Sequence, residues 1–251
     1  LALAERRRMS GADFLHAFIL GLEAESRIGN AVYPSHYDVG WHITATAGVF
    51  GAAAAAGRVL GLTEQQMVWA LGIAATQSSG LREMFGTMVK PMHPGNAARN
   101  GLLAAFLASK NFTSSEQGIE GRRGFANVLA TARNYAEITG KLGETWEISL
   151  NTYKPFACGI VEHPAIDGCI QLRNEHKLEA ENIESISLAV HPLVLELTGK
   201  KTPQTGLEGK FSVYHSSAVA VIHGAAGEEE YSDDVVRDPK VVALRDKVTA
   251  A

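Results

Sequence analysis

The sequence predicts a mainly α protein with an all-helical domain followed by a smaller α+β domain. Apolar residues recur at three- and four-residue spacing between Ser10 and Arg27, which is typical of an amphipathic helix. The run from Thr46 to Leu60 is rich in alanine and glycine, as in a central helix that packs closely on its neighbours. Near Trp146 the spacing changes to alternation, which indicates a strand and a change of domain.

Local signals mark where the helices of the first domain begin. Ser10 is placed to cap the first long helix, and Thr63-Glu-Gln-Gln66 has the pattern of a capping box directly after the Ala-rich helix. Pro94 suits the first turn of a helix, because its missing N–H would have no intrahelical partner there. A helix from Asn96 to Ala108 is therefore expected to follow a loop at 86–96.

The second part of the chain reads as a β-α-β pattern. A strand is expected at 146–153, a helix at 161–176 and a second strand at 183–190. We place the domain boundary between Gly143 and Trp146. Two more helices, at 210–222 and 238–248, are predicted to end the chain.

Composition excludes several classes of protein. The 251 residues are 46% hydrophobic, enough to bury a substantial core, and 23 basic against 27 acidic residues give a formal net charge of −4. No basic face is available to neutralise nucleic-acid phosphates, so we expect no nucleic-acid partner. The apolar runs are short and the first residues lack a signal-peptide pattern, so neither a membrane partner nor secretion is expected.

Cysteine usage favours a reducing, cytoplasmic setting. Only Cys158 and Cys169 are present, without a CxxC pairing, which is too few for a zinc site built on thiolates or for an iron–sulfur cluster. Cys158 as a nucleophile is one interpretation, but a small buried residue in a packed turn is the more frequent case. Nucleotide-binding glycine motifs, HExxH and GxSxG are all absent.

The most informative segment is the Pro- and Gly-containing stretch from Gly86 to Gly101. Pro91 and Pro94 are expected to keep Lys90 and His93 on a loop, next to the N-terminal amides of the following helix. Such a helix end attracts anions. On this local pattern alone, an ordinary helix–loop–helix connection is the commoner explanation.

Four residues stand out by their placement: His42 ahead of a helix, Lys90 and His93 in the segment just described, and Lys154 at the domain change. Ammonium groups hold carboxylates and stabilise developing negative charge, while an imidazole takes or returns a proton. These four side chains therefore suit acid–base chemistry on a polycarboxylate without a metal.

The other histidines are weaker candidates. His36 and His163 rank second, and a structural role is the more frequent one for a histidine inside a helix, as expected for His163. A histidine metal site is the competing chemical interpretation, but no two histidines stand four apart with a carboxylate motif on one helix.

Three stretches carry a resemblance to a known family. Gly40-Trp-His42 precedes the Ala-rich helix, the segment Thr87-Met-Val-Lys90-Pro-Met-His93-Pro-Gly-Asn96-Ala-Ala-Arg99-Asn-Gly lies in the middle, and Tyr153-Lys154-Pro-Phe-Ala-Cys opens the second part. In this order they are similar to the MmgE/PrpD family, which includes 2-methylcitrate dehydratase, cis-aconitate decarboxylase and iminodisuccinate epimerase.

The resemblance implies an architecture and a site. It implies a helical domain at 1–145, an α+β lid domain at 146–208 and a return to the helical domain at 209–251. The active site would lie between the domains, with no metal or organic cofactor, in a homodimer.

The family's functional residues map onto this chain as follows. His42 matches the histidine before the Ala-rich helix, Lys90 the lysine of the K-P-x-H motif and Lys154 the lysine of the lid motif, which makes these three the expected catalytic residues. His93 and Tyr37 match positions that line the substrate pocket.

We therefore expect a cofactor-independent lyase that acts on a small polycarboxylate, by proton abstraction next to a carboxylate and loss of water, as in 2-methylcitrate dehydratase. Epimerisation or decarboxylation of a related acid is the alternative within the family, and a non-catalytic helical interaction protein is the alternative outside it. By the same resemblance, a segment with an aspartate-rich motif and a further histidine would precede Leu1, and helices would follow Ala251. The 251 residues alone are then expected to be less active.

Overall fold

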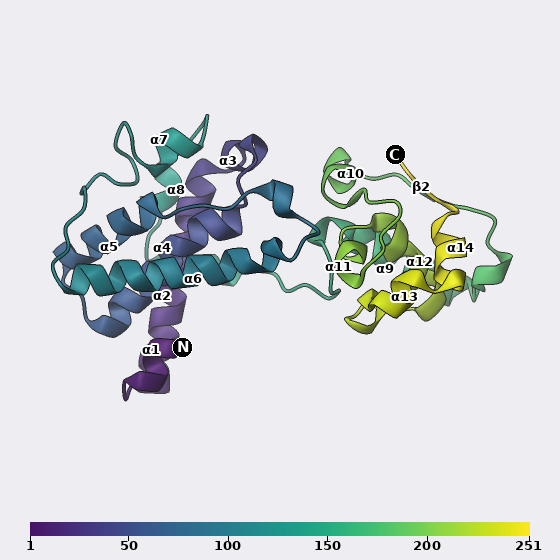
Figure 1. The fold of residues 1–251 in the computed structure, drawn as a ribbon, viewed down its shortest axis with the longest axis horizontal. Helices are drawn as coiled ribbons and strands as arrows, with labels where there is room; N and C mark the ends of the chain where they lie inside the picture. The colour runs from purple at the N-terminus through teal and green to yellow at the C-terminus, as the bar shows by residue number, and fades with distance from the viewer. The chain divides into compact units, whose positions relative to one another are not determined.

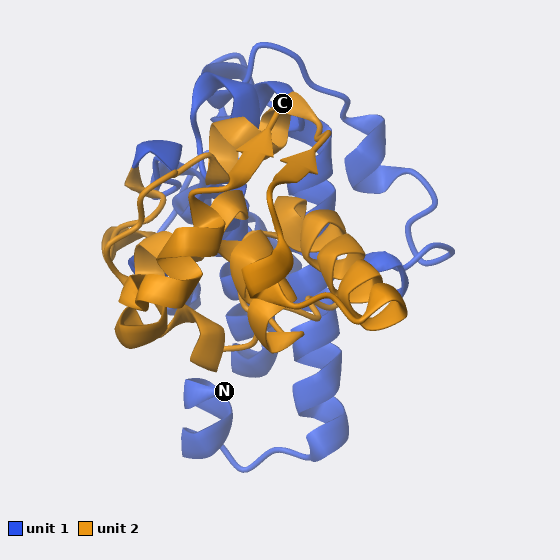
Figure 2. Cartoon of the chain, turned by 90° about the vertical axis from the view of Figure 1, so that its right-hand side faces the viewer, with its two compact units in different colours: residues 1–83, 91–151 blue, residues 84–90, 152–251 orange.

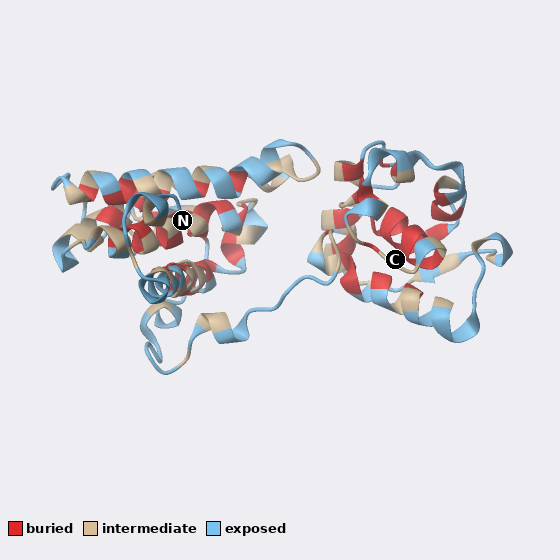
Figure 3. Cartoon of the chain, turned by 90° about the horizontal axis from the view of Figure 1, so that it is seen from below, coloured by how far each residue is buried: buried red, intermediate tan, exposed pale blue.

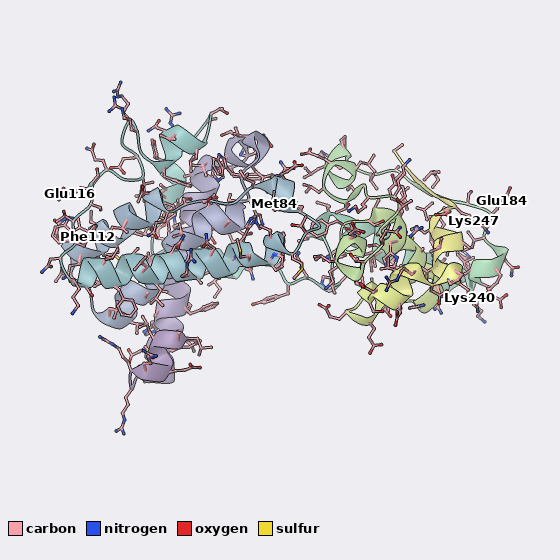
Figure 4. All side chains as sticks on the ribbon, viewed as in Figure 1. Met84, Phe112, Glu116, Glu184, Lys240 and Lys247 are labelled. Atoms are coloured by element: carbon pink, nitrogen blue, oxygen red, sulfur yellow. The ribbon has the colours of Figure 1, made fainter.

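The computed structural model describes residues 1–251 and shows a mainly α protein (Figure 1). The chain divides into two compact units, which are coloured separately in Figure 2. Unit 1 comprises residues 1–83 and 91–151, and unit 2 comprises residues 84–90 and 152–251. Met84, labelled in Figure 4, begins the short piece of chain that belongs to unit 2 before residue 91.

The elements of unit 1 are all helices or 3-10 turns, as predicted for residues 1–145. Its elements are α1 (Ala2–Arg6), α2 (Gly11–Val32), α3 (Ser35–Val39), α4 (Ile43–Leu60), α5 (Glu64–Thr76), the 3-10 turn η1 (Arg82–Met84), α6 (Val89–Ser109), α7 (Phe125–Leu129), α8 (Ala136–Thr139) and η2 (Glu147–Leu150). The last residue of η1 and the first two of α6 are counted with unit 2.

Unit 2 combines short helices with one small sheet. Its elements are η3 (Ile160–Glu162), α9 (His163–His176), η4 (Ala180–Asn182), β1 (Ile186–Leu188), α10 (Pro192–Thr198), α11 (Gly206–Gly209), α12 (Val213–His223), η5 (Glu229–Tyr231), α13 (Asp233–Arg237), α14 (Pro239–Arg245) and β2 (Val248–Ala250). The two strands are parallel, with Ile186 opposite Val248 and Leu188 opposite Ala250.

The helix starts predicted at Ser10 and Thr63 are confirmed. The Ser10 side chain accepts a hydrogen bond from the Asp13 amide at 3.0 Å, which satisfies a free N–H of the first turn of α2. Thr63 and Gln66 form a capping box, with each side chain bonded to the other residue's backbone amide. Both signals were readable because a cap is a local interaction.

Close contact between helix backbones holds the core of unit 1 together. A β-carbon on Gly101 of α6 would lie 2.6 Å from the Val49 carbonyl oxygen of α4, and one on Gly21 of α2 would lie 2.8 Å from the Gly51 carbonyl oxygen. Larger side chains at these positions would push α6 and α2 away from α4. Around these contacts pack Ile28, Val49, Phe50, Ala53, Ile73, Ala104 and Phe125, all buried.

Helix α4 is the central helix of this core. With 18 residues and a mean hydropathy of 1.4 it is long and apolar enough to cross a membrane, yet 56% of it is buried within the protein. A core helix meets the same length and composition criteria. Figure 3 shows buried positions along the interior of each unit.

A buried ion pair ties α2 to the chain that follows α8. Arg27 Nε lies 2.6 Å from Glu23 Oε1, and both side chains are about 5% exposed. The Arg27 guanidinium also donates to the carbonyls of Gly140 and Thr145 at 2.8 Å, and Glu23 Oε2 accepts the Glu147 amide at 2.8 Å. Because these hydrogen bonds satisfy both charges, the pair fixes a segment that has little regular structure of its own.

Three expectations differ from the structure. Residues 89–96 are helical rather than a loop, because α6 begins at Val89 and continues through Pro94. Pro91 is tolerated within the first turn, where its missing N–H would have no partner, and only Pro94 interrupts the backbone bonding. Residues 147–150 form a 3-10 turn instead of a strand. The last helix ends at Arg245, and residues 248–250 form β2.

Residues 209–251 lie in unit 2, whereas the resemblance placed them with the helical domain. β2 pairs with β1, and α12 packs against α9, so both of these elements complete the fold of unit 2. Buried apolar residues from these helices, including Ile166, Ala218, Val219, Val241 and Leu244, form its main core. The pairing of β1 with β2 joins segments about sixty residues apart, which periodicity does not reveal.

A groove along α2 and α4 in unit 1 is lined by Glu25, a partly buried carboxyl group. The groove has a volume of about 860 Å³ and a mostly apolar lining, with Glu25 the charged residue nearest to the glycine-rich face of α4. Burial raises the pKa of Glu25 from 4.5 to about 7. No cationic side chain lies within ion-pair distance of it.

We predict that Glu25→Gln changes how stability depends on pH. A carboxyl whose folded pKa is raised binds its proton more tightly in the folded state, so the stabilisation is present at low pH and is lost as the pH rises from 4.5 to about 7. The native protein should lose up to about 3 kcal/mol relative to E25Q over this range. Urea unfolding at several pH values measures it. A constant difference between the two proteins would contradict the assignment.

Candidate functional site

His42 and His93 form a buried imidazole pair in unit 1. His42 is the N-cap residue of α4, and His93 lies in the second turn of α6. Their Nδ1 atoms are 2.8 Å apart, and the two residues are 6% and 5% exposed. Two ring nitrogens at this distance must share a proton, since one has to donate N–H to the lone pair of the other. The pair can therefore hold and transfer a proton.

The backbone around His42 is fixed by the chain that follows α5. The His42 amide donates to the Gly80 carbonyl and the Arg82 amide donates to the Gly40 carbonyl, both at 2.9 Å. Trp41 and Leu81 form an antiparallel bridge between the two segments. Backbone hydrogen bonds between the two segments thus hold His42 in place at the start of α4.

His36 supports the first turn of α4 and is fully buried. Its Nδ1 lies 2.8 Å from the Leu129 carbonyl oxygen, and its Nε2 lies 2.6 Å from the Thr46 hydroxyl. Burial lowers the pKa of His36, so the ring is neutral, donates from Nδ1 to the carbonyl and accepts the Thr46 hydroxyl at Nε2. His36 is therefore a structural residue next to the imidazole pair.

Tyr37, expected in the substrate pocket, is half-buried and packs against Arg82. The Arg82 guanidinium carbon lies 4.1 Å from the centre of the Tyr37 ring, and Arg82 Nη1 donates to the Tyr37 carbonyl at 2.8 Å. This is a cation–π contact with a backbone hydrogen bond added to it. Sequence reasoning did not single out Arg82, because nothing in its neighbourhood marks it.

Lys90 and Lys154 lie in unit 2, near enough for the charge of Lys154 to act on Lys90. Burial, followed by repulsion from the Lys154 charge, lowers the pKa of Lys90. Neither lysine has a carboxylate within 4.0 Å, whereas Lys200 and Lys210 are paired with Glu208 and Glu228. Lys154 Nζ donates to the Cys158 carbonyl at 3.1 Å. Two adjacent cations without a counter-ion make a site for an anion with two negative charges.

A buried polar chain lies beside Lys154, and sequence reasoning missed it. The Glu162 carboxyl is fully buried and hydrogen-bonded to the Ser216 hydroxyl, which is 2.9 Å from the Tyr231 hydroxyl. Burial raises the pKa of Glu162 well above its ordinary value. No local signal marks these residues, because they come from three separate elements, η3, α12 and η5.

The second-rank candidates of this unit have no direct catalytic role in the geometry. Burial raises the pKa of the Cys158 thiol to about 12, so it is not a thiolate nucleophile. Burial lowers the pKa of His163, which begins α9 and packs edge-on against Phe156. No three side chains of His, Cys, Asp or Glu come together in the arrangement that a metal ion requires.

The five residues expected in the site are thus distributed over both units. The structure brings together His42 and His93, and separately Lys90 and Lys154, while Tyr37 contacts Arg82. Lys90 and His93 are three residues apart in α6. A mainly α protein with one imidazole pair and one ammonium pair has the side chains for acid–base work on an anion.

Comparison with known proteins agrees with this architecture. Residues 1–138 match the model of the MmgE/PrpD N-terminal domain, and residues 156–251 match that of the MmgE/PrpD C-terminal domain. The chain therefore belongs to the MmgE/PrpD family.

Curated relatives are similar along nearly all of the chain. The cis-aconitate decarboxylase of Aspergillus terreus is 31% identical over 269 residues, which cover 99% of this chain and 55% of the relative. The cis-aconitate decarboxylase-like protein oryM of Aspergillus oryzae is 28% identical, over 96% of this chain and 54% of the relative. The cis-aconitate decarboxylase of Homo sapiens is 26% identical, over 98% and 52%. The chain spans about half the length of the curated relatives it matches.

We predict that His42 and His93 adopt opposite tautomers. Because their Nδ1 atoms share one proton, one ring should carry N–H at Nδ1 and the other should carry it at Nε2. Long-range proton–nitrogen NMR correlations measure this for each ring. His36 is the internal reference, since its Nδ1 faces a carbonyl and must be protonated. Two rings that both carry the proton at Nε2 would contradict the shared hydrogen bond.

Proposed function

We propose that this chain forms the site of a cofactor-independent lyase that acts on a small polycarboxylate. The observation that carries the proposal is the Lys90–Lys154 pair, two neighbouring ammonium groups without a carboxylate partner of their own. A ligand with two carboxylates would satisfy both charges, and each charge-assisted hydrogen bond would contribute about 1.5–3 kcal/mol. Membership of the MmgE/PrpD family supports the same substrate class, because curated relatives are named cis-aconitate decarboxylases.

The proton step is assigned to the imidazole pair. In this proposal His42 exchanges a proton with the substrate carbon, and His93 sets the tautomer of His42 through the Nδ1–Nδ1 hydrogen bond. Lys90 and Lys154 hold the carboxylates and stabilise the negative charge that develops next to them. Tyr37 would contribute to the pocket through its ring, which Arg82 holds in place.

Two reactions fit this assignment. In decarboxylation, the bond from carbon to a carboxylate breaks, carbon dioxide leaves, and a proton from the imidazole pair takes up the electron pair left on carbon. In dehydration of a hydroxy acid such as 2-methylcitrate, an imidazole removes the proton next to a carboxylate and hydroxide leaves with a proton as water. The names of the relatives favour decarboxylation, and the motif resemblance alone favoured dehydration. Epimerisation requires only removal of the proton and its return on the other face.

We predict that Lys90→Ala and Lys154→Ala each weaken polycarboxylate binding about 10- to 100-fold, as expected for loss of one charge-assisted hydrogen bond. Isothermal titration of the protein with cis-aconitate, 2-methylcitrate, citrate and iminodisuccinate measures it. Release of carbon dioxide, change in unsaturation and optical rotation then separate the three reactions.

The matched control is Lys240→Ala, which removes an exposed lysine on α14 (Figure 4) and should leave the affinity unchanged. Affinities of K90A and K154A equal to that of the control would remove the lysine pair from the site. Absence of binding and turnover with all four acids would instead favour a non-catalytic helical interaction protein.

A further inference from the structure

Glu162 is the one fully buried carboxyl group in unit 2. It ends η3, has no exposed surface, and its Oε2 atom is hydrogen-bonded to the Ser216 hydroxyl. Its other oxygen, Oε1, is buried without a hydrogen-bond partner. A β-carbon on Gly159 would lie 3.2 Å from Oε1, which places this oxygen against the turn that begins at Gly159. A buried acceptor without a partner lowers the stability of the fold, so its presence calls for an explanation.

The groups that face Glu162 come from four elements. Its own segment contributes Lys154, Cys158 and the following His163, of which Lys154 is the group that carries a charge. Ser216 of α12 and Tyr231 of η5 form the neutral hydrogen-bonded chain at Oε2. Thr198 of α10, also uncharged, lies beside Gly159. Lys154 is therefore the single charge that acts on the Glu162 carboxyl from this set.

The protonation state of Glu162 decides the charge of the lysine pair. With a proton on Glu162, Lys90 and Lys154 present two positive charges. Without it, the negative charge of Glu162 offsets part of that positive charge, because the charges of Glu162 and Lys154 interact through a poorly solvated interior. Burial favours the protonated form, while the hydrogen bond from Ser216 and then the charge of Lys154 favour the ionised form.

We propose that Glu162 sets the charge of the Lys90–Lys154 pair, so that the site takes up an anion with at least two carboxylates together with one proton that resides on Glu162. This inference rests on the function proposed above. An anion with two charges makes the two lysines less available to stabilise an ionised Glu162, and by linkage it favours the protonated acid.

The consequence is a preference for ligands with at least two carboxylates over monocarboxylates. A protonated Glu162 leaves both lysine charges for the ligand, which a monocarboxylate uses only in part. The linked proton also makes affinity fall with rising pH, because each ionisation of Glu162 returns a competing negative charge to Lys154. Glu162 is a positioning residue in this scheme, since it acts on the ligand through Lys154.

The test compares the native protein with Glu162→Gln, which keeps the size and the hydrogen-bonding capacity of the side chain but holds the neutral state. Titration calorimetry with cis-aconitate, in two buffers of different ionisation enthalpy, counts the protons taken up on binding. On binding, the native protein should take up as much as about one proton more than E162Q. In the pH range where Glu162 titrates, the affinity of the native protein should fall by up to about tenfold more per pH unit than that of E162Q. Glu175→Gln, an exposed carboxyl on α9, is the matched control and should behave as the native protein.

Carboxyl-carbon NMR of the native protein provides a second measurement that does not depend on the folding of E162Q. The Glu162 signal should titrate at a higher pH with cis-aconitate bound than without it. Equal proton uptake in the native protein and E162Q, or an unchanged Glu162 titration, would overturn the inference while leaving the lysine site intact. Failure of cis-aconitate to bind to the native protein would overturn both the inference and the site on which it rests.

Discussion

The close approach of helix backbones around α4 is the constraint on which unit 1 depends. Glycine on α2 and on α6 lets both helices lie against α4 at distances that a β-carbon would prevent. The imidazole pair depends on the same contact, because His42 begins α4 and His93 lies on α6. A hydrogen bond of 2.8 Å between two rings on different helices requires that the relative position of those helices be fixed.

The imidazole pair and the lysine pair are placed in different surroundings. The imidazole pair is buried in a packed helical core, where hydrogen bonds fix the backbone and His36 anchors α4. Lys154 is exposed and lies on a segment without helix or strand. It donates a hydrogen bond to the Cys158 carbonyl and interacts electrostatically with the buried Glu162. A rigid group suits directed proton transfer, while a flexible ammonium can follow a carboxylate.

Much of this organisation was readable from the sequence, and the exceptions have physical causes. Local interactions were predicted correctly, as at the Ser10 and Thr63 caps, and so was the helical nature of residues 1–145. The loop predicted at residues 86–96 is helical from Val89, because the first turn tolerates Pro91 and the helix continues through the interruption at Pro94. The motif resemblance singled out His42, Lys90, His93 and Lys154. The structure shows in addition that His42 is paired with His93 and that the charge of Lys154 acts on Lys90.

Contacts between distant segments could not be predicted. The strands β1 and β2 pair although they lie about sixty residues apart in the sequence. The Glu162 carboxyl is bonded to Ser216, which is 54 positions further on, and Ser216 in turn contacts Tyr231 of another element. Glu23 and Arg27 stand four residues apart, so their pairing on one helix face is expected. The segment whose carbonyls cover and bond to Arg27 lies more than 110 residues further along the chain. Such groups carry no signature in their own neighbourhood.

Burial and the charge of Lys154 together lower the pKa of Lys90, which has a consequence for its chemical reactivity. A lysine whose pKa is lowered carries a larger fraction of the uncharged amine, and the uncharged amine is the nucleophile. Lys90 is thus a preferred target for acylating and carbamylating reagents compared with the solvated lysines of the same chain. An anion seated between the two ammonium groups would restore the proton and protect it, so electrophilic labelling becomes a direct readout of occupancy.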